Sequence, residues 1–327
     1  MATGAQYEFL TTIGTDIDKA TQLILEGELV AIPTETVYGL AANGLNKKAV
    51  EKIFIAKRRP SNNPLILHVA HLDQIKELIR ELPSQALELF KKFSPGPLTL
   101  LLPKKENVPS IVNNSLPDIA VRIPNHSLTL ALLEKVGVPL AAPSANPFGY
   151  ISPTTALHVK NMLAGKIEYI LDGGTCSSGL ESTILGFPEG VPTIYRVGMI
   201  TQEEIEQLIG PVELNQSTLT LAPGMLKSHY SPYTPLILSE DIGSDIERFK
   251  QQKLGIITYN ILAEGVDAQH QLLLCKNNEF AIAAKNLYAA LHEMDKKGYD
   301  LILVQKFPPI GIGNTLNDRL RRASFKD

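Results

Sequence analysis

The chain has 327 residues, 44% of them hydrophobic and 20% charged, and a formal net charge of −3 at pH 7. Its length exceeds that of one typical domain, about 100–200 residues, so the sequence predicts two packed domains. The small negative charge excludes a polycation that coats nucleic acid through many phosphate contacts, and it limits any contact with RNA to a local patch.

The N-terminal two-thirds of the chain alternates short apolar runs with segments of helical periodicity. The apolar runs predict strands that end at Ile32 or occupy residues 65–69, 98–102, 119–123 and 167–171. Apolar residues spaced by three and four positions predict helices at 16–26, 45–56, 72–82 and 127–136. This alternation is typical of an α/β domain, which we assign to residues 1–210.

Residues 211–235 interrupt the alternation with four prolines and no sustained apolar period, so we interpret them as a linker that could also serve as a lid. In residues 236–327, apolar runs predict strands at 236–238, 254–259 and 301–304. Helical periodicity predicts a long helix from Phe280 to Met294 and a basic helix at 315–322. We therefore expect a small second α/β domain.

The sequence shows no targeting segment and no disulfide framework. Residues 1–30 lack an apolar core between a basic start and a small-residue cleavage site. No run of about 18 apolar residues occurs, so we expect no segment to cross a bilayer. Cys176 and Cys275 lack metal-ligand spacing, which favours free thiols in a reducing compartment. We expect a cytoplasmic protein.

Several familiar motifs are absent. The sequence has no GxxxxGK[ST] loop and no GxGxxG after a predicted strand, which argues against a P-loop site and a dinucleotide site. It also lacks HExxH and GxSxG, which are typical of metalloproteases and α/β-hydrolases. Because an α/β sheet presents its binding crevice at strand ends, candidate residues are the polar ones that follow predicted strands.

The segment PTETVYGL, residues 33–40, follows a strand that Pro33 stops. We expect Thr34, Glu35 and Thr36 to open a short helix, whose N-terminus would suit an anion or an amino acid. Ordinary helix capping by threonine is the alternative interpretation.

The segment 57–64 places three cations before a proline-bounded turn. Lys57 and Arg59 are two positions apart, and in a non-helical segment they could converge on one ligand. The guanidinium of Arg59 suits triphosphate oxygens. The alternative is a solvated basic helix end that complements the helix dipole.

Two further segments place polar residues in or after apolar strands. Ser144 and Asn146 follow the strand in PLAAPSAN and could bind a ligand, although both residue types also form ordinary turns. Arg122 lies inside the apolar run AVRIP, so it needs an anionic partner from the protein or from a ligand. His68, also in an apolar strand, could be a satisfied core histidine or a ligand contact.

Taken together, these segments resemble the YrdC-like domain of threonylcarbamoyl-AMP synthases. The matching motifs follow that family's order and spacing: PTETVYGL, KRRPSNNPLILH, PGPLTLLL, AVRIP, PLAAPSAN and GLESTI. The segments APGMLKSHYSP and GIGNTLNDRLRRAS are similar to the longer, two-domain form of the family. The resemblance implies a twisted, open α/β sheet domain followed by a small Rossmann-like α/β domain.

Position by position, the resemblance implies the site residues. The catalytic residues would be Lys57, Arg59, Ser144 and Asn146. Threonine contacts would fall on Thr36, His68, Arg122 and Ser182. ATP contacts would fall on Arg59, Asn63, Ser144, Ser152, Arg196 and Tyr230. Asp118 is left out, because an acidic group near phosphates would repel them.

The resemblance also implies a reaction, in which L-threonine, bicarbonate and ATP give threonylcarbamoyl-AMP, pyrophosphate and water. This is the first step in forming N6-threonylcarbamoyladenosine in tRNA; Mg²⁺ would accompany ATP, and a downstream transferase would use the product. Every reactant is anionic, so the site needs cations that position and neutralise them, and no side-chain nucleophile is required. The chain could also contact tRNA weakly.

Two alternatives stay open. The first is a non-catalytic RNA-binding module, suggested by Lys57-Arg58-Arg59 and by Arg319, Arg321 and Arg322. The second is another carbamoyl-type transferase built on the same domain. Zinc-finger motifs or an acylphosphatase-like domain would support the second alternative, and the sequence contains neither.

Overall fold

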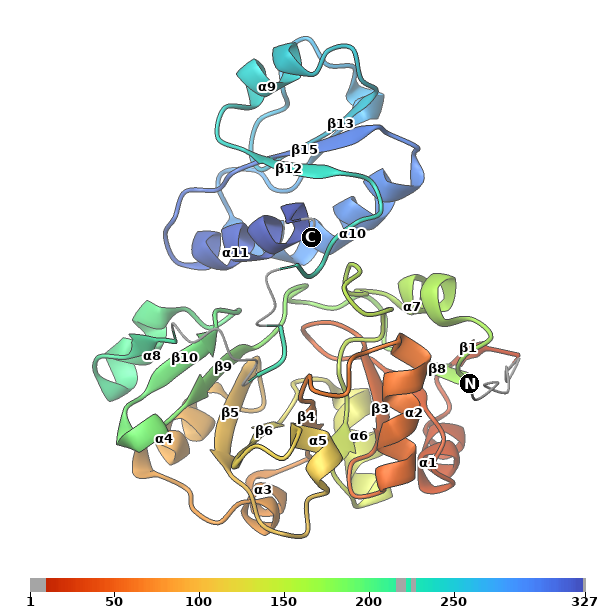
Figure 1. Cartoon of the computed structure of the whole chain (residues 1–327), viewed down its shortest axis with the longest axis vertical. Helices are drawn as coiled ribbons and strands as arrows, with labels where there is room; N and C mark the ends of the chain where they lie inside the picture. Colours follow the sequence, from red (N-terminus) through yellow and green to blue (C-terminus); the bar gives the residue numbers. More distant parts are fainter. Residues whose placement is uncertain (1–9, 216–221, 225–227, 326–327) are drawn as a thin grey trace.

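The computed structural model describes residues 10–215, 222–224 and 228–325, which form two sheets (Figure 1). An eleven-stranded sheet contains β1 to β11, and a four-stranded sheet contains β12 to β15. The expected α/β fold class is confirmed. Of the predicted linker, residues 216–221 and 225–227 lie outside the described residues.

The large sheet is mixed, with the strand order β1-β8-β2-β3-β7-β4-β6-β5-β9-β10-β11. Its strands are β1 (Thr12–Gly14), β2 (Val30–Ile32), β3 (Gly39–Asn43), β4 (Ile66–His68), β5 (Leu98–Pro103), β6 (Asp118–Arg122), β7 (Leu140–Ala141), β8 (Tyr169–Leu171), β9 (Thr183–Gly186), β10 (Thr193–Arg196) and β11 (Glu213–Leu214). Its helices are α1 (Ile17–Leu25), α2 (Lys47–Lys57), α3 (Leu72–Leu78), α4 (Ser84–Phe93), α5 (Ser110–Asn113), α6 (Ser127–Val136), α7 (Ala156–Leu163) and α8 (Gln202–Ile209), with a 3₁₀ turn at Pro188–Gly190.

Local signals set several helix ends. The Asp16 side chain accepts a hydrogen bond from the Lys19 backbone N–H and caps α1. Thr201 and Glu204 form a reciprocal capping box at the start of α8. Gly137, with a φ of 66°, ends α6 in the left-handed conformation. The predicted helix at 127–136 is therefore confirmed with its exact bounds.

Two local predictions are wrong. Residues 34–36 do not open a helix but connect the antiparallel strands β2 and β3. Thr34 Oγ1 accepts from the backbone N–H groups of Thr36 and Val37 and donates to the Val37 carbonyl, which closes a tight turn. The predicted helix at 72–82 ends early, because Ile79 leaves it to form a β-bridge with Lys104.

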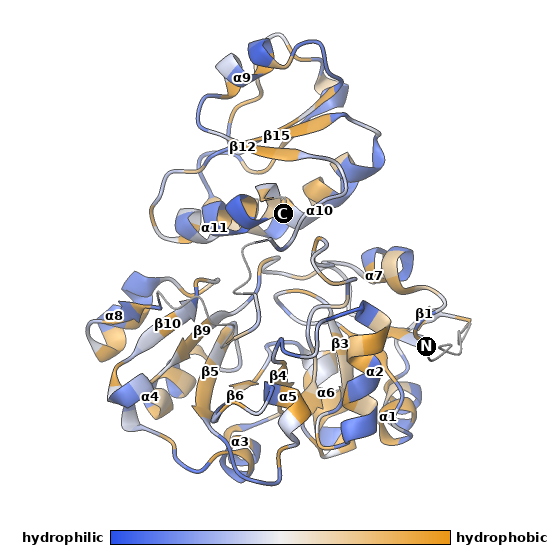
Figure 2. Ribbon diagram, viewed as in Figure 1, coloured by the Kyte–Doolittle hydropathy of each residue, from blue (hydrophilic) through white to orange (hydrophobic). Residues whose placement is uncertain are grey.

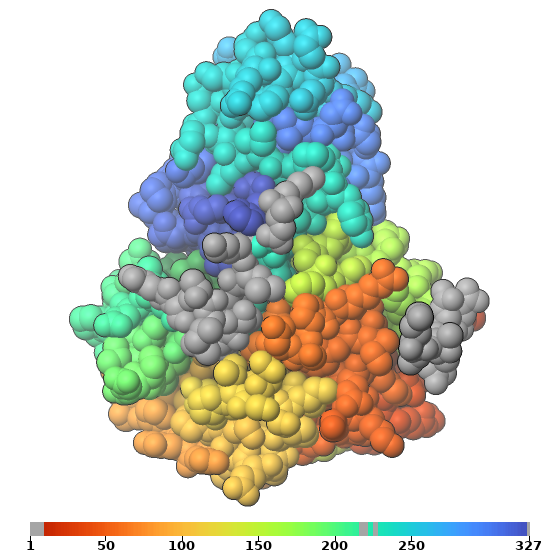
Figure 3. All heavy atoms as spheres, in the orientation of Figure 1, coloured from red at the N-terminus to blue at the C-terminus, as the bar shows by residue number. Residues whose placement is uncertain are grey.

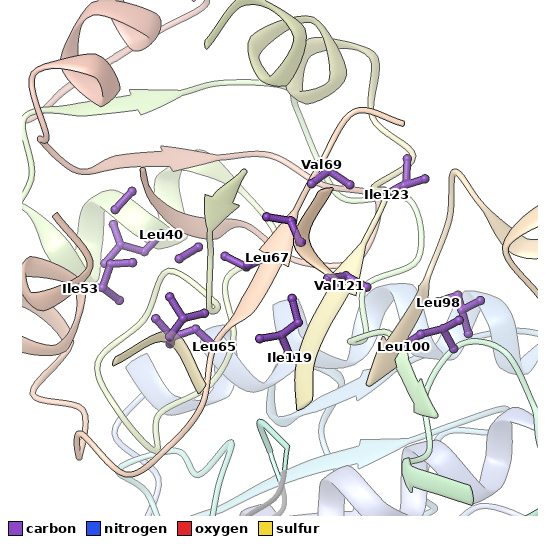
Figure 4. Packing of buried hydrophobic residues seen from close by; sticks show 14 of the residues in the cluster. Leu40, Ile53, Leu65, Leu67, Val69, Leu98, Leu100, Ile119, Val121 and Ile123 are labelled. Carbon is purple, nitrogen blue, oxygen red and sulfur yellow. The ribbon is translucent and has the colours of Figure 1, made fainter. Parts of the chain in front are cut away.

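The core of the large domain lies between the sheet and its helices. Figure 4 shows Leu40, Leu67, Val121 and Leu100, from adjoining or nearby strands, packed in one cluster with Ile53 of α2. All five side chains are buried. Burial of this apolar surface is the main driving force for folding, at roughly 25 cal/mol per Å². It fixes the strands whose ends carry the polar residues.

The small domain is built on an all-parallel sheet with the order β12-β15-β13-β14. Its elements are β12 (Leu236–Ser239), α9 (Ile242–Arg248), β13 (Leu254–Thr258), a 3₁₀ turn (Ala268–His270), β14 (Gln271–Leu273), α10 (Phe280–Lys296), β15 (Leu301–Gln305) and α11 (Ile312–Ser324). The strands β12 and β15 are predominantly hydrophobic, as expected for a sheet covered on both faces (Figure 2).

The helices α10 and α11 lie between the small sheet and the large domain (Figure 1). One buried cluster joins the two domains, since it contains Val37, Ile151 and Leu180 together with Tyr288 and Leu316. The space-filling view shows the small domain seated directly on the large one (Figure 3). The interface is therefore a continuous apolar core rather than a loose contact.

The start of the predicted linker belongs to the large sheet, because β11 pairs in parallel with β10. We therefore propose that the first domain extends beyond the expected residue 210 to the end of β11, and that the second domain begins close to residue 236. Within the described residues, no helix combines the length and the apolarity needed to span a membrane.

Candidate functional site

A small cavity lies at the ends of β4 and β6, bordered by the loop after β2 and by the described parts of the linker. The volume open to the centre of a water molecule is about 50 Å³. Its polar lining residues are Thr34, Thr36, Arg59, His68, Arg122, Ser144, Glu181, Ser182, Arg196, His229 and Tyr230. The structure thus brings together all four predicted threonine contacts and Arg59, Ser144, Arg196 and Tyr230 of the predicted ATP contacts.

Arg122 is fixed by three contacts inside the large domain. Its Nε donates to the Gly96 carbonyl at 3.2 Å, and Nη1 donates to Thr36 Oγ1 at 2.9 Å. Nη2 lies 2.7 Å from Glu35 Oε1 and forms a buried ion pair. The alignment is poor, since Nη2 and both Glu35 carboxylate oxygens lack a hydrogen-bond partner among the described residues. The anionic partner that the sequence required for Arg122 is therefore Glu35.

His68 lies beside Arg122, because parallel pairing of β4 with β6 sets the two residues opposite each other. Burial, together with the charge of Arg122, lowers the pKa of His68 to about 3, so the ring is neutral at pH 7. Its Nδ1 has no hydrogen-bond partner among the described residues. A neutral imidazole with a free nitrogen suits a hydroxyl or an amine better than a phosphate.

Arg59 is held from behind by the turn that follows α2. Its Nη2 donates to Asn63 Oδ1 at 2.6 Å and to the Pro64 carbonyl at 2.9 Å, and its Nε donates to the Asn63 carbonyl at 3.2 Å. Burial lowers the pKa of Arg59 to about 9. The interaction with Tyr230 raises this pKa, and the charge of Arg196 lowers it further. The guanidinium therefore remains cationic at pH 7, and Asn63 orients it from outside the cavity.

Lys57 does not line the cavity. As the last residue of α2, it turns its ammonium group onto the backbone carbonyls of Ser144, at 2.5 Å, and Asn146. Burial and the charge of Arg59 lower the pKa of Lys57 well below its usual value. In this structure Arg59 lines the cavity and Lys57 does not, so the convergence of the two residues on one ligand stays a prediction.

The loop after β7 is the part of the site that Lys57 supports. Ser144 faces the cavity, whereas Asn146 lies behind it and donates through Nδ2 to the carbonyls of Pro147, at 2.9 Å, and Tyr150, at 2.8 Å. Asp118 begins β6, at the other end of the strand from Arg122, and does not line the cavity.

Ser182 and Arg196 form a second hydrogen-bonded unit. Arg196 Nη2 donates to Ser182 Oγ at 3.0 Å, and its Nε donates to the Ser182 carbonyl at 3.0 Å. Ser182 Oγ also lies 2.7 Å from Thr99 Oγ1. Arg196 Nη1 donates to the Pro223 carbonyl at 3.2 Å, which attaches the linker to this wall of the cavity.

The linker covers the cavity at Gly224 and Tyr230. Gly224 has a φ of 80°, and a Cβ at this position would lie 2.6 Å from Tyr230 Oη, so only glycine fits. Tyr230 is buried and also adopts a positive φ, 64°. Such backbone strain persists only where surrounding packing holds it, which is typical of ligand-binding segments.

Four polar residues in or beside the cavity were not predicted as site residues: Thr34, Glu35, Glu181 and His229. Glu35 and Glu181 lie within the motifs PTETVYGL and GLESTI. The available signal was an acidic residue beside small polar residues in an apolar segment. Glu181 accepts from Ser152 Oγ at 2.7 Å, which places Ser152 behind the cavity wall instead of in the cavity. Burial lowers the pKa of His229 well below its usual value, with Arg59 the largest of several charges that add to the effect.

The basic residues that suggested RNA binding are largely buried. Lys57, Arg59 and Arg319 are each at most 8% exposed, whereas Arg58 and Arg321 remain at the surface. A phosphate backbone needs accessible cations, so these positions do not form the patch that the RNA-binding alternative requires.

Comparisons with known proteins identify the family of the chain. One family model, described as "Telomere recombination", matches residues 22–198, and another, described as "Threonylcarbamoyl-AMP synthase, C-terminal domain", matches residues 200–324. Threonylcarbamoyl-AMP synthase of Bacillus subtilis is 40% identical over 96% of this chain and 94% of its own length. Threonylcarbamoyl-AMP synthase of Pyrococcus abyssi is 42% identical, with 93% of each chain covered.

The crystal structure of P. abyssi Sua5 complexed with L-threonine matches this fold with a TM-score of 0.89 at 40% identity, covering 97% of each chain. The likeness extends across both sheets, and the family predicted from the sequence motifs is confirmed. The chain therefore belongs to the threonylcarbamoyl-AMP synthase family, in the form that carries the C-terminal domain.

Proposed function

We propose that this chain makes threonylcarbamoyl-AMP and pyrophosphate from L-threonine, bicarbonate and ATP, and that the cavity at the ends of β4 and β6 holds the reacting groups. The observation that carries the proposal is the convergence of Arg59, Arg122 and Arg196 on one cavity beside the neutral His68. All three reactants are anionic, and preorganised cations in a site shielded from water stabilise such charges strongly.

Threonine would bind on the side formed by Thr36, His68, Arg122 and Ser182. Arg122 Nη2 forms no aligned hydrogen bond within the described protein, so it retains a donor for the threonine carboxylate. The free Nδ1 of His68 would meet the hydroxyl or the amine. A pocket that hydrogen-bonds the hydroxyl rejects valine strongly, because valine leaves those groups unpaired.

ATP would bind on the side formed by Arg59, Ser144, Arg196 and Tyr230. Lys57, Asn63, Asn146 and Ser152 would act from behind, since they hold the loop at 144–146, Arg59 and Glu181 in place. In this arrangement, some of the predicted ATP and catalytic residues would contact the ligand, and the others would hold those contacting residues in position.

The reaction would proceed in two steps that need no covalent intermediate with the protein. The neutral threonine amine attacks the bicarbonate-derived carbon, water leaves, and N-carboxy-threonine forms. The new carboxylate then attacks the α-phosphorus of ATP, and pyrophosphate leaves. Positioning and charge neutralisation carry the rate. Burial raises the pKa of the Cys176 thiol to about 12, which agrees with the absence of thiol chemistry in this scheme.

Mg²⁺ would enter with ATP. Among the described residues, no three His, Cys, Asp or Glu side chains gather into a possible metal site. Phosphate oxygens and water would therefore supply most ligands, as is usual for this ion, and we assign no step to it.

The linker would act as a lid. The cavity volume of about 50 Å³ is well below the roughly 300–1,000 Å³ of ordinary ligand pockets, so we propose that Gly224 and Tyr230 move to admit ATP. Reclosure would exclude water from an adenylate that hydrolyses readily. We propose that the product, threonylcarbamoyl-AMP, then passes to a transferase that acts on an adenosine of tRNA.

The test is pyrophosphate release by the purified chain. Release should require threonine, bicarbonate and Mg²⁺-ATP together, and labelled bicarbonate should appear in a product that also contains threonine and AMP. Valine should be nearly inert, and serine, which lacks only a methyl group, should give a reduced signal. Release that is indifferent to bicarbonate would rule out the carbamate mechanism, because an ordinary amino-acid-activating enzyme adenylates the amino acid's own carboxylate.

A further inference from the structure

We propose that Arg319, on α11 of the small domain, is a positioning residue of the active site: it neutralises Glu181 and holds Tyr230, so that Arg196 stays available to the phosphates of ATP. The proposal rests on the function proposed above, since it takes ATP as the ligand. It assigns the small domain a part in substrate binding that is separate from the closing of the linker.

Arg319 reaches across the domain interface and is 1% exposed. Its Nε donates to Glu181 Oε2 at 2.7 Å, although the two residues are 138 positions apart in the sequence. Its Nη2 donates to the Val197 carbonyl at 2.8 Å, and its Nη1 donates to Asp318 Oδ2 at 2.5 Å. Each nitrogen of the guanidinium therefore has a partner within the protein, and Arg319 does not line the cavity, so we assign it a positioning role.

Glu181 is the carboxylate that faces the cavity on this side. Beside Arg319, it accepts from Tyr288 Oη at 3.0 and 3.1 Å and from Ser152 Oγ at 2.7 Å. Burial alone would raise the pKa of Glu181, but the charges of Arg319 and then Arg196 lower it overall, so the group is an anion at pH 7. A buried anion beside a phosphate site is tolerable only if it is neutralised.

Tyr230 is the second residue that Arg319 holds. The Arg319 guanidinium lies over the Tyr230 ring, 5.1 Å from its centroid, and the Tyr288 ring stacks on Tyr230 at a centroid distance of 5.9 Å. Such a cation–π contact attracts the guanidinium to the face of the ring and helps to hold the ring in place. Two residues of the small domain thus support the strained linker residue that lines the cavity.

Loss of Arg319 would change the charge of the cavity. The titratable groups still facing Glu181 would be Arg196 of β10, Tyr288 of α10 and Tyr230 of the linker. The uncompensated carboxylate would repel ATP phosphates and compete for Arg196, whose hydrogen bonds among the described residues go to Ser182 and Pro223. Protonation of Glu181 would relieve both effects.

The experiment compares Arg319→Gln, Glu181→Gln and the double variant with wild type in the full chain. The control, Arg321→Gln, removes an exposed arginine from the same helix. We expect Arg319→Gln to raise the KM for ATP about tenfold or more, because a charge-assisted contact is lost in a buried site. The double variant should return to within about fivefold of wild type, because its unpaired buried charge is gone. Arg321→Gln should match wild type.

Two further readouts separate positioning from mere stability. Calorimetry with a non-hydrolysable ATP analogue should rank the variants by affinity in the same order as their KM values for ATP. The activity ratio of Arg319→Gln to wild type should rise as the pH falls, because Glu181 in the variant becomes protonated. If Arg319→Gln does not fold, the double variant provides the test. Its affinity for the ATP analogue should then lie within about fivefold of the wild-type affinity, which corresponds to about 1 kcal/mol.

The proposal is overturned if Arg319→Gln keeps the wild-type KM and analogue affinity, or if the double variant is as defective as the single one with no dependence on pH. An inactive wild-type protein would instead overturn the proposed function, so the two failures are distinguishable.

Discussion

Glu35–Arg122 and Glu181–Arg319 are both buried ion pairs with a closest N–O distance of 2.7 Å. They differ in the hydrogen bonds that their carboxylate oxygens form. Both Glu181 oxygens accept further hydrogen bonds, from Tyr288 and Ser152. Both Glu35 oxygens and Arg122 Nη2 have no hydrogen-bond partner among the described residues. A buried polar group without a partner is costly, so such groups concentrate where a ligand completes them.

The two ion pairs therefore have different roles. The Glu35–Arg122 pair lies within the large domain and has unpaired polar atoms, which we propose are available to threonine. The Glu181–Arg319 pair links two domains and is complete in itself, so it holds the cavity wall without contacting substrate through its arginine. The three predictions below test this comparison.

The largest effect is expected for Arg122→Gln. Removing one partner of a buried ion pair leaves Glu35 uncompensated, which costs about 3–5 kcal/mol of the free energy of unfolding. Threonine-dependent pyrophosphate release should also fall about a hundredfold, through loss of a charge-assisted contact. Urea unfolding and initial rates measure the two losses. Wild-type turnover by a folded Arg122→Gln protein would contradict the assignment of this pair to threonine binding.

An intermediate effect comes from removing one hydroxyl beside each pair. Thr36→Val leaves Arg122 Nη1 without its acceptor and should cost about 1–3 kcal/mol, with a clear rise in the KM for threonine. Ser152→Ala removes a donor from Glu181, which keeps Arg319 and Tyr288, and should cost only about 0.5–1.5 kcal/mol. Steady-state kinetics distinguish the variants, because only Thr36→Val should change the KM for threonine. Equal changes would mean that both pairs contact threonine.

The smallest effect is expected in mild acid. Burial lowers the pKa of both His68, beside Arg122, and His292, whose Nε2 contacts the Ser152 carbonyl, to about 3. The unfolded chain, with histidine pKa values near 6.5, binds more protons than the folded chain between the two values, so stability falls as the pH drops below about 6.5.

Each of these histidines should contribute about 1 kcal/mol of the stability lost between pH 7 and pH 5.5. His68→Gln and His292→Gln should each flatten the dependence of the melting temperature on pH. The exposed His71 provides a matched control, since His71→Gln should leave the slope unchanged. A slope that neither buried variant alters would show that other groups control acid stability.

Sequence alone predicted the elements whose signals are local. The apolar run of β5 and the periodicity of α6 were sufficient, because each pattern reports burial. The turn at Thr34–Thr36 was not predictable, because the pairing of β2 with β3 overrides the helix-capping pattern. The short helix α9 also gave no signal, since none of its residues is buried.

For the site, the sequence by itself determined the family, the fold class and the identity of the cavity's cations, because collinear motifs record which residue types stand at strand ends. Only the tertiary structure decided which of them line the cavity. Lys57 turned out to hold backbone carbonyls, and Arg319, which the sequence placed in a basic tail, is buried against Glu181. The physical reason is that the partner of a charge is set by chain segments far away in sequence, and local periodicity carries no information about them.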